Sequence, residues 1–167
     1  MQLIFMKQVL YLLIFISALS CSTKEENAMS LLDVNTAYEI SKTFPVSPDK
    51  VYSALTDSSV LKKIWGVQSI NVDAKVGGKT NAIYVEGNQD WSFTITYLEV
   101  VPNEKLKWLT HFKSFPSKET RVTLLFKKAE AGTELIIRME NFESKEERDA
   151  NKGAWETGLK TLEGILK

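Results

Sequence analysis

The chain has 167 residues, the length of one ordinary domain, and its 44% hydrophobic and 25% charged residues are typical of a globular protein. The 21 basic and 21 acidic residues balance, which argues against a nucleic-acid partner held by a basic surface. One cysteine excludes an intrachain disulfide, and one histidine excludes a metal site made of several histidines. We therefore expect no metal, no cofactor and no nucleic acid.

The first 20 residues have the pattern of a bacterial secretory signal peptide. Lys7 precedes an almost unbroken apolar run at residues 9–19, and small residues follow it. The run is shorter than the roughly 20 apolar residues that a membrane span needs. We therefore predict that residues 1–20 are a signal peptide.

The only cysteine, Cys21, directly follows this segment. Residues 17–21 resemble a lipobox, the signal for lipidation of the cysteine and cleavage before it, although Ala18 stands where leucine is usual. Ordinary signal cleavage is the alternative, but the position of the sole cysteine favours lipidation, and several acyl chains would anchor the protein stably. We predict that residues 21–36 are a lipidated cysteine and flexible tether, which places the protein on a membrane of the bacterial cell envelope, periplasmic or surface-exposed.

The predicted domain, residues 37–167, begins with one strand and two short helices. Apolar and polar side chains alternate over residues 38–44, as in a half-buried strand. Ser47 before Pro48 predicts a capped helix start. Asp57 begins a second short helix, and Gly66 ends it.

From residue 67 onward the hydrophobic period is two, which predicts six strands. Gly77 and Gly78 suit a primed hairpin turn between strands at residues 68–75 and 79–85. Four further strands carry their apolar side chains on one face: Trp91, Phe93, Ile95 and Tyr97; Leu106, Trp108 and Phe112; Val122, Leu124 and Phe126; Leu135, Ile137 and Met139.

A long helix is predicted over residues 145–166. Ser144 and Glu147 fit a capping box, in which each side chain accepts from the other residue's amide. The apolar stripe behind it has helical spacing: Trp155, Gly158, Leu159, Leu162, Ile165 and Leu166. Within this stripe, Gly158 either lets the helix approach the sheet closely or leaves room for a ligand. Consecutive hairpins and one long helix together predict an α+β fold in which the helix covers the concave face of an antiparallel sheet.

A series of short motifs covers nearly all of residues 38–167: residues 44–48, 51–57, 61–65, 76–78, 99–106, 132–135 and 153–155, then Leu159 and Leu162. In this order they resemble the activator of Hsp90 ATPase homologue-like family of the START/Bet v-type (SRPBCC) superfamily, although the family often has two adjacent tryptophans where Ile64 and Trp65 stand. The resemblance implies a helix-grip fold, with about seven curved antiparallel strands around the C-terminal helix and two short helices after the first strand. It says little about activity, because the superfamily includes lipid carriers, cyclases and co-chaperone domains.

Few residues suggest catalysis. Glu99 shares the inward parity of its strand, but a bulge before Pro102 would turn it outward, and we favour the bulge. His111 has the parity opposite Trp108, which favours a surface or edge position over a catalytic base. Lys42 shares the parity of its apolar neighbours, so it lies at the sheet edge or faces a cavity.

A phosphate-binding loop is also disfavoured. Gly78, Lys79 and Thr80 look like its end, but Asp73 stands where glycine is required and a strand follows instead of a helix. No nucleophile-elbow motif or metal-ligand pair occurs, so we predict no catalytic residue.

We predict a ligand cavity between the sheet and the last helix. Tryptophans are more often core residues than ligand contacts, but cavity walls in this fold are built from such side chains. The predicted cavity residues are Trp65, Trp91, Phe93, Tyr97, Trp108, Leu135, Met139, Trp155 and Gly158.

The favoured function is non-enzymatic binding of a small apolar or amphipathic molecule, such as a lipid, by a membrane-anchored domain. A protein-interaction or co-chaperone role is the alternative, and the signal peptide argues against a literal Hsp90 role because Hsp90 and ATP are cytosolic. A cyclase- or isomerase-type enzyme using Glu99, His111 or Tyr97 is less favoured.

Overall fold

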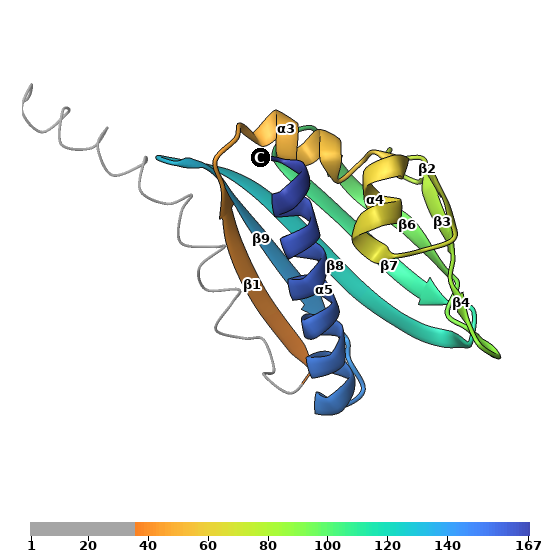
Figure 1. Ribbon diagram of the computed structural model, residues 1–167. Helices are drawn as coiled ribbons and strands as arrows, with labels where there is room; N and C mark the ends of the chain where they lie inside the picture. The colour runs from red at the N-terminus through yellow and green to blue at the C-terminus, as the bar shows by residue number, and fades with distance from the viewer. Residues whose placement is uncertain (1–35) are drawn as a thin grey trace, which may run out of the picture. The chain divides into compact units, whose positions relative to one another are not determined.

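The computed structural model of the protein describes residues 36–167 (Figure 1). The predicted signal peptide, the predicted lipidation site at Cys21 and nearly all of the predicted tether lie outside these residues. Within the described range, no helix combines the length and the apolar character needed to cross a membrane.

Seven antiparallel strands form one sheet in the order β1-β9-β8-β7-β6-β3-β2. The first strand thus pairs with the last, and the others pair mostly as consecutive hairpins. This confirms the predicted α+β fold with a seven-stranded antiparallel sheet. The strands are β1 (Ala37–Phe44), β2 (Ser69–Val72), β3 (Lys79–Ile83), β6 (Phe93–Val101), β7 (Lys105–Phe112), β8 (Phe115–Ala129) and β9 (Gly132–Glu140).

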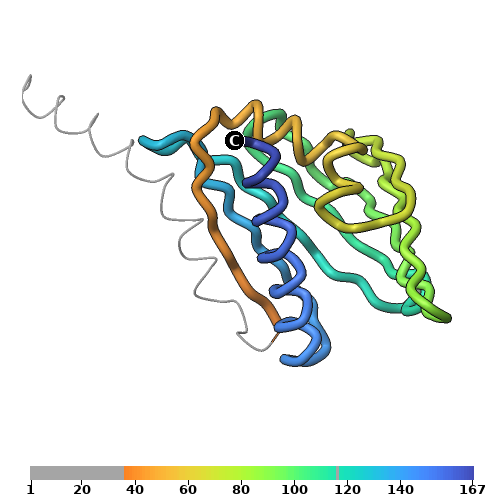
Figure 2. Tube along the Cα trace, viewed as in Figure 1, coloured from red at the N-terminus to blue at the C-terminus, as the bar shows by residue number. Residues whose placement is uncertain are grey.

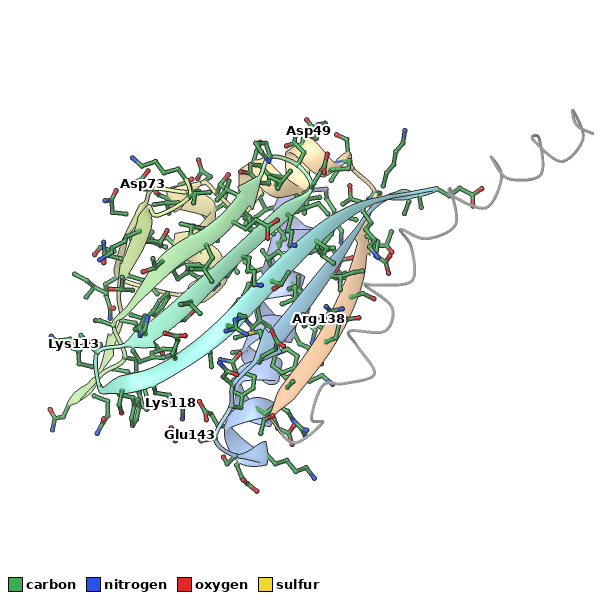
Figure 3. All side chains as sticks on the ribbon, turned by 180° about the vertical axis from the view of Figure 1, so that it is seen from behind. Asp49, Asp73, Lys113, Lys118, Arg138 and Glu143 are labelled. Atoms are coloured by element: carbon green, nitrogen blue, oxygen red, sulfur yellow. The ribbon has the colours of Figure 1, made fainter. Side chains whose placement is uncertain are left out.

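Three helices, α3 (Pro48–Ala54), α4 (Ser58–Trp65) and α5 (Lys145–Ile165), lie on one face of the sheet (Figure 1). The chain trace in Figure 2 shows α5 running obliquely across the sheet, with the α3–α4 bracket at one end. Among residues 36–167, the view from behind shows no helix over the other face, where Arg138 bonds Glu39 over 2.8 Å (Figure 3). The long C-terminal helix is therefore confirmed as the cover of a single face.

The helix ends follow the sequence signals with two corrections. Asp57 accepts hydrogen bonds from the amides of Ser59 and Val60, and Gly66 ends α4 with φ of 63°, as predicted. Ser47 occupies the first capping position, but its side chain makes no capping bond.

The second correction concerns the capping box of α5. Ser144 accepts from the Glu147 amide over 3.2 Å, as predicted, but the Glu147 carboxylate accepts from the Glu143 amide instead of that of Ser144. The same carboxylate lies 2.6 Å from Lys118 Nζ, and this ion pair draws it toward β8.

Two turns also differ from the predictions. The β2–β3 connection is a six-residue loop, residues 73–78, because β2 already ends at Val72 and the Gly77 amide bonds Tyr97 O. The prediction of a two-residue turn at Gly77 and Gly78 was therefore wrong. An additional two-stranded hairpin, β4 (Val85–Glu86) and β5 (Gln89–Asp90), precedes β6, so Trp91 lies before that strand and not in it.

The packed core lies between the sheet, α3, α4 and the C-terminal half of α5. Its side chains come from every layer of the fold, and the largest fully buried ones include Phe44, Val51, Leu61, Leu106, Leu124, Leu135, Ile137 and Leu162. Burial of these side chains holds α5 against the strands at this end.

Candidate functional site

Beside the packed core lies a partly open cavity of about 620 Å³, between α4, residues 151–161 of α5 and the middle of the sheet. The sheet supplies its floor through Phe93, Ile95, Trp108, Thr110, Phe112, Thr120, Val122 and Met139. The helices supply its roof, mainly through Ile64, Trp65, Asn151, Ala154, Trp155 and Gly158.

A connected series of aromatic rings forms one wall of this cavity. Trp155 of α5 meets Trp65 of α4 edge-on at 6.5 Å between ring centroids, and Trp65 meets Phe93 of β6 at 5.5 Å. Phe93 in turn lies 5.5 Å from Phe112 of β7. Because such pairs have preferred distances and tilts, they set the spacing between both helices and the sheet.

The helix roof is closed by a tight contact between α4 and α5. A Cβ atom on Gly158 would lie 2.9 Å from Ile64 Cγ2, which is too close for real atoms. The close approach expected at this glycine therefore exists, but its partner is α4 and not the sheet. Gly158 also borders the cavity, so it serves the roof contact and the cavity wall together.

An ion pair joins the start of β8 to the start of α5. Lys118 Nζ lies 2.6 Å from Glu147 and 3.3 Å from Glu143. Figure 3 shows Lys118 and Glu143 near each other at this end of the molecule. Lys118 precedes the cavity residue Thr120 by two positions on the same face of β8, so the pair fixes the roof beside that part of the floor.

Polar groups are few among the apolar walls. Thr110 and Thr120 lie opposite each other in the β7–β8 register, and both are nearly fully buried. Trp108 Nε1 donates a hydrogen bond of 3.1 Å to Thr110 Oγ1. Lys63 is the one charged residue among the cavity residues, and it is exposed.

Three further lining residues carry hydroxyl groups whose protons bond elsewhere: Tyr84, Thr157 and Thr161. Tyr38 orients another polar group of the wall, the side-chain amide of Asn151. The Tyr38 hydroxyl lies 2.9 Å from Asn151 Oδ1 and 2.9 Å from Met139 Sδ. Burial, and to a lesser extent the charge of Glu156, raise the pKa of Tyr38, so the hydroxyl stays protonated. Its single proton goes to the amide oxygen, which is a far better acceptor than a thioether.

Six of the nine residues predicted for the cavity line it: Trp65, Phe93, Trp108, Met139, Trp155 and Gly158. The other three lie elsewhere. Trp91 packs on Phe115 at 6.0 Å, Tyr97 is buried beside Trp108 with its hydroxyl 3.0 Å from Thr80, and Leu135 belongs to the packed core. That the cavity holds a ligand stays a prediction.

Sequence reasoning missed several lining residues. Alternation along the strands places Thr110, Phe112 and Val122 on the same face as their inward-pointing neighbours, so the sequence could have predicted them. Asn151 stands four residues before Trp155 and seven before Gly158, so helical spacing also places it on the cavity face.

The residues considered for acid–base chemistry lie outside the cavity wall. A register shift between Tyr97 and Glu99 confirms the predicted bulge, and Glu99 pairs with Lys105 over 3.1 Å. His111 lies 3.5 Å from Glu119 and is partly exposed, which confirms its surface position. Lys42 lies at the edge strand, where it binds Glu163 of α5 over 2.7 Å.

Comparison with known families gives one match over most of the chain. The profile of the family described as "Activator of Hsp90 ATPase homolog 1-like protein" matches residues 45–167. No curated protein sequence matches significantly.

Solved structures share the fold at low sequence identity. A protein from Chromobacterium violaceum has a TM-score of 0.68 at 22% identity, covering 78% of this chain and 97% of its own. A protein of unknown function from Staphylococcus aureus has 0.67 at 22%, covering 79% and 93%. An HSP90 activator from Plasmodium falciparum has 0.65 at 23%, covering 78% and 96%. These likenesses establish the fold alone.

Proposed function

The chain belongs to the Activator of Hsp90 ATPase homolog 1-like family, and we propose that its domain binds a small apolar or amphipathic molecule in the cavity beneath α4 and α5. One observation carries the proposal, namely a cavity of about 620 Å³ that is partly open to solvent and has mostly apolar walls. Small-molecule sites typically enclose roughly 300–1,000 Å³ and combine such walls with a few oriented polar groups.

Binding without catalysis is the better account of this cavity. Its wall contains no aspartate, glutamate or histidine, and the acid–base candidates Glu99 and His111 bond other residues outside it. A general base has to reach the proton that it removes. The HSP90 activator from Plasmodium falciparum shares only the fold with this chain, so it adds no specific support for a co-chaperone role.

Two substitutions on the same face of β8 test the proposal. Val122 lies on the cavity floor, and Leu124 lies two residues further along, in the packed core. Val122→Phe should put its ring into the cavity with little loss of stability and block binding of the uncharged fluorescent probe N-phenyl-1-naphthylamine. Leu124→Phe adds less volume but should destabilise the fold by about 1–3 kcal/mol, because its surroundings are full.

The measurements are thermal unfolding and probe titration. The parent protein should bind the probe with a stoichiometry near one. If the parent does not bind it, or if Val122→Phe costs as much stability as Leu124→Phe, the cavity is not a ligand site.

The proposal includes a location. The lipobox-like residues 17–21 support a domain held at a membrane of the bacterial cell envelope by acyl chains on Cys21. Cys21→Ala should move the protein from the membrane to the soluble fraction of its host, whereas the neighbouring control Ser22→Ala should not. A Cys21→Ala protein that stays with the membrane would contradict the anchor.

A further inference from the structure

The polar groups of the cavity wall offer protons. Thr110 accepts from Trp108 Nε1, which leaves the proton of its own hydroxyl available. No sealed side-chain nitrogen or oxygen within residues 36–167 lacks a hydrogen-bond partner. Thr120 makes no side-chain hydrogen bond in that range and is only 4% exposed, so its hydroxyl opens into the cavity that it lines.

The third group, the amide of Asn151, also offers protons. Its oxygen is engaged by the protonated hydroxyl of Tyr38, which fixes the amide so that the NH₂ group is the free end. Asn151 lines the cavity from the roof, while Thr110 and Thr120 face each other on the floor. Donors from both layers therefore border one cavity. The threonine hydroxyls can also accept, but the NH₂ group of Asn151 can only donate, so a molecule bound against it must supply the acceptor.

The charge of the wall decides what kind of acceptor fits. The one charged lining residue is Lys63 of α4, which is exposed, whereas Thr110, Thr120 and Asn151 are uncharged. An ionised carboxylate placed against these three residues would lose its hydration without gaining a counter-charge, which is strongly unfavourable. A carbonyl oxygen gains hydrogen bonds there and carries no charge to desolvate.

We propose that the cavity selects an apolar ligand with a neutral carbonyl group, a ketone, ester or amide, whose oxygen accepts hydrogen bonds from Thr110, Thr120 and Asn151. This inference rests on the proposed function, since it names the class of ligand for the same cavity. Apolar walls supply most of the affinity, and the three donors select the carbonyl compound over a hydrocarbon of equal size.

Three small probes of nearly equal shape test this selection. In 2-ethylnaphthalene the position of interest is a methylene group, in 2-acetylnaphthalene it is a carbonyl, and 2-naphthoate carries a carboxylate. Titration of the full-length protein with each probe should give an affinity about tenfold higher for 2-acetylnaphthalene than for 2-ethylnaphthalene. We expect 2-naphthoate to bind more weakly than the ketone.

Substitutions assign the selection to the donors. Thr120→Val keeps the side-chain shape and should remove most of the preference for the ketone, without changing ethylnaphthalene binding or lowering the melting temperature. Asn151→Asp keeps the acceptor for Tyr38 and replaces the NH₂ donors, so it should weaken ketone binding most. Thr96→Val, on the opposite face of β6, is the matched control and should change nothing.

The outcomes separate this inference from the proposed function. Equal affinities for ketone and hydrocarbon, or a Thr120→Val variant that retains the preference, would overturn the carbonyl site and leave a simple apolar binding cavity. Tighter binding of 2-naphthoate would show that the selected acceptor is anionic, contrary to the proposal. Failure of all three probes to bind would overturn the binding function itself.

Discussion

The two ends of the space beneath α5 differ in how they are filled. At the C-terminal half of the helix, Leu159 and Leu162 are buried against a close-packed core. At the N-terminal half, Asn151 and Trp155 border a cavity of about 620 Å³. One helix thus serves a solid end and a hollow end.

The comparison shows how a stable fold can include empty volume. Close packing of the solid end contributes the burial that keeps the helix on the sheet. The hollow end is held open by contacts around its edge, namely the Gly158–Ile64 approach, the aromatic series through Trp65 and the Lys118–Glu147 ion pair. Substitutions at the two ends should therefore differ in kind, with loss of stability at one and loss of binding at the other.

Truncation in the solid end should have the largest effect. Leu162 is fully buried, so Leu162→Ala should lower the free energy of unfolding by about 2–5 kcal/mol through lost burial and a new void. Urea-induced unfolding measures this directly. A loss below about 1 kcal/mol would mean that this end is not close-packed.

Truncation in the hollow end should cost less, although the side chain is larger. Trp155 is half-buried and faces the cavity, so Trp155→Ala should lower the free energy of unfolding by about 1–2 kcal/mol, below the range typical of core tryptophans. The same variant should weaken binding of the uncharged probe N-phenyl-1-naphthylamine by removing one wall. A stability loss exceeding that of Leu162→Ala, with unchanged probe binding, would remove the distinction between the two ends.

The fold followed from periodicity, and the division into two ends did not. Alternating side chains along β6 to β9 predicted which face is inward, and the capping signals located α4 and α5. Alternation, however, predicts only the face on which a side chain lies and not which helix, if any, packs over it. Tyr97 and Leu135 point inward as predicted and are packed over, whereas Phe93 and Met139 on the same strands face the cavity. That difference depends on where α4 and α5 lie, which is a tertiary property.

Contacts between distant segments were equally hard to predict. Gly158 was identifiable as a close-approach position, but nothing in the local sequence names Ile64 as its partner. The loop at residues 73–78 is another case, because its length follows from the backbone bond between Gly77 and Tyr97, two residues far apart in the chain. Local propensity cannot encode such pairs.

Two helix glycines give a smaller, paired effect. Within a helix, Ala is favoured over Gly by about 1 kcal/mol. Because Gly164 has open space where a Cβ would lie, Gly164→Ala should stabilise the protein by nearly that amount. Gly158→Ala gains the same propensity but forces its Cβ against Ile64, so it should be neutral or destabilising by up to about 2 kcal/mol. Thermal unfolding of both variants checks the pair, and equal stabilisation would show that the α4–α5 contact is looser than described.

Acid titration should give the smallest effect, at the β4–β5 hairpin. Asp90 joins the β4–β5 hairpin to the β7–β8 turn, accepting from Lys113 Nζ over 2.7 Å and from the Ser92 amide over 3.0 Å. The hydrogen bond from Lys113, followed by the bonds from Ser92, lowers the pKa of Asp90 from 3.8 to about 2. Because the folded-state pKa is the lower one, the unfolded chain takes up the proton first as pH falls.

The Asp90 contribution to stability is therefore complete above about pH 5 and is lost as the pH falls toward 2. Asp90→Asn should reduce stability slightly at pH 5, and the difference from the parent protein should shrink to nothing near pH 2. Urea unfolding at several pH values measures this difference, and NMR titration of the carboxyl carbon gives the pKa itself. A difference that is the same at pH 5 and pH 2 would show that the Asp90 charge does not stabilise the contact between the β4–β5 hairpin and the β7–β8 turn.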